Sequence, residues 1–139
     1  MSMIRETRDL IEISKCFPME KELRVKGYDA TPLNDGIAMI VRNAHADPNF
    51  HFWLAENEEK EMTGYMFFNV IPGGRLFIGR VWTKRWDMEQ VERFKKKLEE
   101  FSAGNGVTSW SAFANRQNTF AMMHGYGFEP VATLAERRL

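Results

Sequence analysis

Histidine and cysteine side chains can act as acids, bases, nucleophiles or metal ligands, and the sequence has three histidines and one cysteine. His124 lies near the end of the chain, and an unperturbed imidazole titrates at about pH 6.5, so this side chain can serve as a general acid or base. It can equally be an exposed or locally hydrogen-bonded histidine. His45 and His51 do not share metal-ligand spacing with it, and Cys16 has no second cysteine to complete a thiolate site. The sequence therefore predicts no metal site.

Charged side chains cluster where an extended segment gives way to a helix. Lys84 and Arg85 are adjacent cations that can contact an anion, and Asp87 and Glu89 follow them. Asp87 precedes Gln90 by three residues, which approximates a capping box, so we expect Asp87 to cap the helix. The two cations are explained equally well as solvated side chains in front of an acid-capped helix, and both interpretations stay open.

Alternating helical and extended patterns must position these side chains. One apolar stripe at helical spacing begins at Leu33, after Thr31, which can cap, and Pro32, which fits a first helical position. A similar stripe covers 91–101. Aromatic-rich and alternating segments predict strands. The predicted strands cover residues 3–6, 51–56, 63–71, 75–83 and 107–114, with a last strand from 129, and the predicted helices begin near residues 10, 32, 88 and 118.

Composition and charge narrow the class of protein. The length of 139 residues predicts a single domain, 1-139, because a chain of this size buries one core. Lysine plus arginine equals aspartate plus glutamate at 19 each, so we expect no nucleic-acid partner. The chain starts with no long apolar run or signal pattern, and its single cysteine cannot form an internal disulfide. We therefore expect a cytoplasmic protein that does not bind a membrane.

The order of the predicted elements provides a family comparison. With Asn115 ending an apolar strand and Gly127-Phe128 closing a short helix, this order resembles the GCN5-related N-acetyltransferase (GNAT) superfamily over nearly the whole chain. The resemblance implies an α+β fold of three layers, in which a mixed, mainly antiparallel sheet has helices on both faces. It also implies a splayed central pair of strands, here 75–83 and 107–114. The chain is identified as a divergent member.

The resemblance also implies acetyl-CoA as the co-substrate. In the family the pantetheine arm enters the gap between the splayed strands, and its amides bond to exposed backbone. By resemblance this role falls to the backbone of Val81, Trp82 and Thr83. Asn115 and Asn118 are candidates for further amide contacts, although asparagine is also a common helix cap.

The chain departs from the family in the segment that binds the diphosphate. The family has an arginine or glutamine followed by spaced glycines there, because bare amides at a helix N-terminus must approach phosphate oxygens closely. In this chain Trp86, Glu89 and Val91 occupy those positions. Lys84 and Arg85 are the side chains left to offset the charge of a diphosphate.

The catalytic acid of the family is also replaced. The departing thiolate is commonly protonated by a tyrosine, and Met123 stands at that position, while Tyr126 comes three residues later between two glycines. His124 is the expected substitute, because an imidazole can transfer a proton. Glu56 and Glu61, near the ends of predicted strands, are candidates for removing the proton of the amine through water. These glutamates and His124 are the candidate catalytic residues.

Two functions fit these observations. The first is acetyl transfer from acetyl-CoA to an unidentified amine, on a small molecule or a protein, by direct attack on the thioester. The second is a protein that keeps the fold, has lost the reaction, and serves as a regulatory module that binds a protein partner or a second copy of itself. Small relatives in bacteria and their phages are compatible with the second. Fold alone does not choose between them.

Overall fold

A five-stranded sheet organises the part of the chain that the structure describes. The computed structural model describes residues 3–113 and 126–128, without the side chain of Trp86. In chain order the elements are β1 (Met3–Glu6), α1 (Leu10–Ile13), η1 (Ser14–Cys16), α2 (Phe17–Val25), α3 (Leu33–Ala46), β2 (Phe50–Glu56), β3 (Met62–Ile71), β4 (Arg75–Thr83), η2 (Lys84–Trp86), α4 (Met88–Gly104) and β5 (Ser109–Ala112). The strands follow one another in the sheet in the order β1-β2-β3-β4-β5. Only β4 and β5 are parallel.

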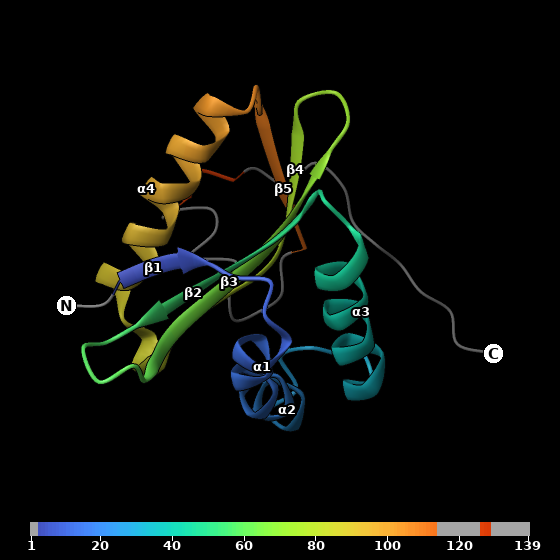
Figure 1. Cartoon of the computed structure of the whole chain (residues 1–139), viewed down its shortest axis with the longest axis vertical. Coiled ribbons are helices and arrows are strands. Elements are labelled where there is room, and N and C mark those ends of the chain that lie inside the picture. Colours follow the sequence, from blue (N-terminus) through green and yellow to red (C-terminus); the bar gives the residue numbers. More distant parts are fainter. Residues whose placement is uncertain (1–2, 114–125, 129–139) are drawn as a thin grey trace.

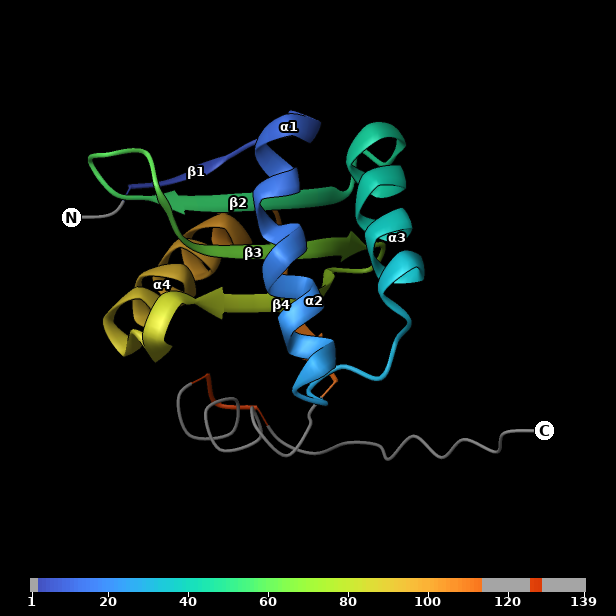
Figure 2. The same cartoon turned by 90° about the horizontal axis from the view of Figure 1, so that it is seen from below.

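Helices cover both faces of this sheet (Figure 1). The helices α1, α2 and α3 lie on one face, and α4 crosses the other. Figure 2 shows α2 in front of the central strands and α3 beside it. The predicted α+β fold, with a mixed, mainly antiparallel sheet between two helical layers, is confirmed. Among the helices described here, none combines the length and apolar character needed to cross a bilayer.

The central strands send alternate aromatic side chains into two cores. Phe50, Phe52 and Phe67 pack with residues of α1 to α3, whereas Trp53 and Phe68 pack with α4. Because helices cover both faces, β2 and β3 carry nearly continuous runs of buried residues. This explains why the sequence shows an aromatic-rich pattern here instead of a clean alternation of apolar and polar residues.

The start of α3 differs from the prediction. The helix begins at Leu33, and neither Pro32 nor any side chain before it makes a capping hydrogen bond. Thr31 was expected to cap, and this was wrong. Its carbonyl accepts a hydrogen bond from Arg24 at 2.7 Å, and its backbone N–H donates to Asp29 at 2.8 Å. Thr31 therefore belongs to the connection between α2 and α3.

A bulge in β4 changes the direction of this strand. Arg80 lies opposite Phe67 and Ile78 opposite Phe68, which leaves Gly79 as one extra residue on β4. A Cβ atom at Gly79 would lie 2.5 Å from a ring carbon of the buried Phe67. The close approach of this ring therefore requires glycine at the bulge.

The strands β4 and β5 part at this bulge. Residues Ser109–Ala112 of β5 pair with Arg75–Ile78 of β4, and these four pairs are all that the described residues form between the two strands. The remaining residues of β4, 79–83, stay paired with β3 on one side. Their other side has no strand partner in the part of the chain that the structure describes. The predicted splay of the central strand pair is confirmed, with β5 shorter than the 107–114 expected from the sequence.

Candidate functional site

A cleft opens where β4 and β5 diverge. Its volume is about 470 Å³, a size suited to a small-molecule ligand. Part of its wall is charged and comes from α2, from the connection between α2 and α3, and from β4. The rest is mainly apolar, and the strand junction contributes Phe77, Ile78, Val81, Ala112 and Phe113.

The backbone of Gly79–Thr83 is one edge of β4, and three of its residues, Gly79, Arg80 and Val81, line this cleft. Successive peptide groups of a strand point to alternate sides, so about half of the N–H and C=O groups in this segment face away from β3. Within residues 3–113 and 126–128, no strand pairs with them. Backbone polar groups require hydrogen-bond partners. This edge is therefore suited to an extended ligand that carries its own amides, which can add to the sheet like a strand.

A network of charged side chains forms the polar wall. Glu20, on α2, is 1% exposed, and its carboxylate accepts two hydrogen bonds from Arg80 at 2.9 and 3.0 Å. Arg24 donates to the same carboxylate at 3.0 Å, and the phenol of Tyr65 donates to it as well. Asp29, between α2 and α3, accepts a further hydrogen bond from Arg80. The network thus ties the helical layer to β4 one residue beyond the bulge.

Burial and hydrogen bonding shift the pKa values of the carboxylates in this network in opposite directions. Burial raises the pKa of Glu20, but the hydrogen bonds from Arg80, Tyr65 and Arg24 outweigh it and hold the pKa below its ordinary value. Burial and hydrogen bonding to Arg80 compete in the same way at Asp29, and its pKa is also lowered. Burial and the neighbouring Glu20 raise the pKa of Tyr65 well above its usual range. Two carboxylates and two guanidinium groups therefore face one another at neutral pH with no net charge.

The predicted pantetheine-binding residues lie along β4 beyond its pairs with β5. Val81 lines the cleft. Trp82 stacks against Tyr65 with ring centroids 5.5 Å apart, and Thr83 is buried. Their predicted role depends on the backbone of β4, and of the three residues only Val81 lines the cleft.

The basic pair expected near the diphosphate lies in η2. Lys84 and Arg85 are both exposed, and Arg85 has a φ of 60°, a conformation sparsely populated by residues other than glycine. Asp87 caps α4 as predicted, since its carboxylate accepts a hydrogen bond from the backbone N–H of Gln90 at 3.2 Å. A diphosphate at this helix end would meet a carboxylate, so its positive partners would be the side chains of Lys84 and Arg85.

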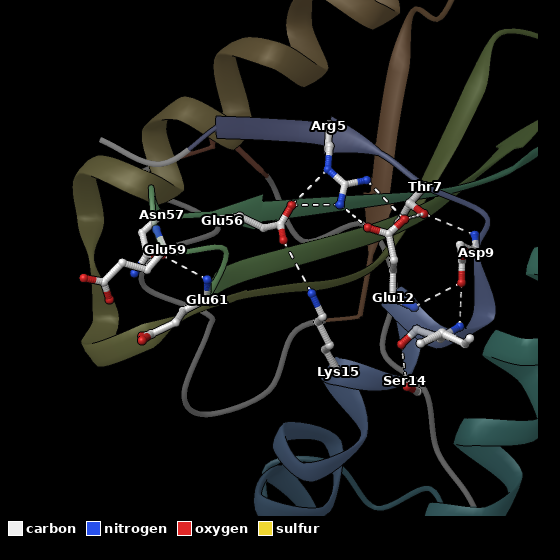
Figure 3. Close-up of polar contacts among 11 residues, drawn as sticks. Arg5, Thr7, Asp9, Glu12, Ser14, Lys15, Glu56, Asn57, Glu59 and Glu61 are labelled. Carbon is white, nitrogen blue, oxygen red and sulfur yellow. Dashed lines mark hydrogen bonds and ion pairs between the residues drawn. The ribbon is translucent and has the colours of Figure 1, made fainter.

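The two candidate bases lie near the turn between β2 and β3, and Figure 3 shows their contacts. Glu56, the last residue of β2, accepts a hydrogen bond from Arg5 at 2.9 Å and pairs with Lys15 at 3.5 Å. Glu61 is exposed, and its backbone N–H donates to Asn57 at 2.9 Å. Neither glutamate lines the cleft. Their role as bases stays a prediction, and Glu56 already contacts two cations.

Three predicted site residues, Asn115, Asn118 and His124, lie outside the described residues. Tyr126 is described and lines the cleft. Its phenol donates a hydrogen bond to the carbonyl of Val91 at 3.0 Å, and burial raises its pKa. Tyr126 therefore contributes a neutral phenol to the cleft wall at ordinary pH.

Sequence reasoning missed the charged wall. The sequence did contain one indication of it, which is Arg80. This charged residue lies in a strand of a sheet that was expected to have helices on both faces, and a charged side chain buried there requires a partner. The partners themselves carried no signal, because Glu20 and Asp29 are 60 and 51 residues away along the chain. No local pattern encodes contacts over such separations.

Comparison with solved structures shows which fold this is. A candidate acetyltransferase from Pyrococcus furiosus matches with a TM-score of 0.75 at 14% identity, covering 100% of both chains. A candidate acetyltransferase from Clostridium acetobutylicum, solved with acetyl-CoA, has a TM-score of 0.74 at 15% identity, covering 99% of this chain and 96% of that one. An aminoglycoside 6'-N-acetyltransferase from Acinetobacter baumannii has a TM-score of 0.71 at 10% identity, covering 100% and 98%. No protein-family model matches the sequence, and no curated protein matches it.

Sequence identities this low establish the fold, but they do not establish the activity or the substrate of this chain. The chain has the GNAT acetyltransferase fold, as the order of its predicted elements implied.

Proposed function

We propose that this chain is an N-acetyltransferase that transfers an acetyl group from acetyl-CoA to an amine by direct attack. The observation that carries the proposal is the divergence of β4 from β5 at Gly79, with a cleft at that point. The solved structures named above are acetyltransferases or candidates for that activity, and one of them contains acetyl-CoA. Both the cleft and the fold therefore favour a thioester bound between these two strands.

The free edge of β4 is the proposed contact for the pantetheine arm. Amides of an extended arm can hydrogen bond to the backbone of Val81, Trp82 and Thr83, as an added strand would. Contacts of this kind do not depend on side-chain identity, so they are compatible with a diverged sequence. Lys84 and Arg85 follow directly and supply the positive charge for the diphosphate.

The proposed reaction needs a nucleophilic amine, a base and an acid. The amine nitrogen attacks the carbonyl carbon of the thioester, a C–N bond forms, the C–S bond breaks, and the departing thiolate takes a proton. Backbone N–H groups at the bulge are suited to stabilise the developing oxyanion. His124 is the proposed acid, Glu56 or Glu61 the proposed base acting through water, and Asn115 and Asn118 are proposed to bond the arm.

A binding module that has lost the reaction is the second candidate. The observation that favours it is the start of α4, where Asp87 already caps the helix and Glu89 is exposed beside it. Two unit charges 4 Å apart interact by about 1 kcal/mol even in water, so these acids weaken any diphosphate contact there. The cleft would then receive a protein partner or a second copy of the chain.

Thermal denaturation with acetyl-CoA separates the two candidates. At 100 times its Kd, a ligand that binds the folded state alone stabilises it by about 2.7 kcal/mol, so the Tm of an acetyltransferase should rise. ATP, which has nucleotide phosphates but no thioester arm, is the control and should produce little change. Release of free thiol in the presence of amines then measures turnover. An unchanged Tm up to millimolar acetyl-CoA would count against the enzyme and in favour of the binding module.

A further inference from the structure

The cleft contains two carboxylates that differ in their capacity to accept another hydrogen bond. An ionised carboxylate offers about four lone-pair sites. Glu20 uses all of them, because Oε1 accepts from Arg24 and Arg80, and Oε2 accepts from Arg80 and Tyr65. At 1% exposure this carboxylate is also out of reach of a ligand. Glu20 is therefore a fixed part of the wall.

The carboxylate of Asp29 accepts fewer hydrogen bonds than that of Glu20. Its Oδ1 accepts from the backbone N–H of Thr31 at 2.8 Å, and its Oδ2 accepts from Arg80. The nearest nitrogen of Arg24 is 3.6 Å from Oδ2, a distance that fits an ion pair and is too long for a hydrogen bond. The side chain of Asp29 is 19% exposed, and it lines the cleft. Counting the contacts within residues 3–113 and 126–128, each of its oxygens therefore has about one further lone-pair site for a ligand.

Asp29 is held in the same cleft as the free edge of β4. It lies in the connection between α2 and α3, which Figure 2 shows beyond the end of α2. Arg80, which bonds to Asp29, directly follows Gly79 at the bulge where the strands part. The guanidinium of Arg80 is fixed in turn by the buried Glu20. A group bound to Asp29 would thus lie in the same cleft as the proposed path of the thioester.

We infer that Asp29 binds the acceptor as a cationic alkylamine, with Arg80 as the residue that positions Asp29. The inference rests on the proposed acetyl transfer and names the acceptor class for it. A carboxylate holds an ammonium group through charge-assisted hydrogen bonds, and the nearby Met39 and Phe77 offer apolar surface to a carbon skeleton. The bound ammonium loses one proton through water to the base, and the neutral nitrogen then attacks the thioester.

Calorimetric titration of amines into variants of the whole chain tests this assignment. The probes are spermidine, kanamycin and a lysine-containing peptide, with an aniline, which is neutral at pH 7.5, for comparison. Asp29→Asn keeps a carbonyl that can accept from Thr31 but removes the charge, and it should weaken binding of the cationic probes by about tenfold or more. Asp35→Asn, an exposed position on α3 outside the cleft, removes the same charge and should have no effect. Asp29→Glu restores the charge and should recover part of the affinity.

The outcomes are distinct from those of the acetyl-CoA experiment. Weaker binding of cationic amines by Asp29→Asn alone, with the acetyl-CoA effect on Tm intact, supports the assignment. Equal binding by Asp29→Asn and the unmodified chain overturns it, and so does a chain that binds the aniline but no cationic probe. A chain that binds no amine also overturns it, and the acetyl-CoA experiment still decides the proposed function. If Asp29→Asn does not fold, Asp29→Glu is compared with the unmodified chain, and unaltered probe affinities contradict the assignment.

Discussion

Replacing Glu20 with alanine is expected to lower the free energy of unfolding by about 3 to 5 kcal/mol, because breaking a buried ion pair leaves its partner charge uncompensated. Glu20 is the common acceptor for Arg80, Arg24 and Tyr65. Without it, Asp29 is the one charged partner that the described residues leave to the partly buried guanidinium of Arg80. A loss of this size is a large part of the whole stability of a small domain. Denaturation in urea measures it directly.

Glu22 provides a matched control on the same helix. It is exposed and pairs with Lys26 at 2.8 Å, and such surface pairs contribute roughly 0 to 1 kcal/mol, so Glu22→Ala should change little. The pKa of Glu20 lies below its ordinary value, so the contribution of Glu20 is present at neutral pH and is lost as the pH falls through the folded-state pKa. The difference between the unmodified chain and Glu20→Ala should therefore shrink in acid. Similar effects of the two alanine variants at neutral pH would show that the network is not a major source of stability.

Replacing Ala112 with tryptophan is expected to abolish the effect of acetyl-CoA on Tm. Ala112 forms the last pair of β5 with β4, opposite Ile78, and it lines the cleft where the strands part. An indole at this position would fill the space that the thioester arm is proposed to enter. The measurement is the Tm of the variant with and without acetyl-CoA at concentrations that saturate the unmodified chain.

Ser109→Trp controls for the added bulk. Ser109 is exposed at the other end of β5, opposite Arg75, and does not line the cleft. This variant should keep the acetyl-CoA effect, and both variants should unfold cooperatively without ligand. Undiminished stabilisation of folded Ala112→Trp by acetyl-CoA would place the ligand outside the gap between β4 and β5.

Local sequence patterns predicted most of the helices and strands. The apolar stripe at 91–101 predicted α4, and Phe94 and Leu98 within it are fully buried. The limits of β1 and β4 match the prediction, and those of β2 and β3 differ by one residue at one end. Periodicity and turn residues carry this information, since each is a property of neighbouring positions.

The site depends on contacts that such patterns do not contain. The need for glycine at the bulge follows from the position of the Phe67 ring across the ladder, and a lone glycine within a strand does not reveal the bulge. Asp29, in the connection between α2 and α3, belongs to the site because Arg80 hydrogen bonds to it from a strand far away in the sequence. The resemblance to the GNAT superfamily, seen in the order of the elements, implied the splayed pair of strands. The charged wall of the cleft became visible only in the structure.

Hydrogen exchange along β4 tests the central claim most directly, since that claim places acetyl-CoA against the open backbone edge of Gly79–Thr83. Saturating acetyl-CoA should slow exchange of those amides in this segment that face away from β3, while amides in the interior of β2 keep their rates. Unchanged exchange throughout 79–83 in the presence of bound acetyl-CoA would contradict the account.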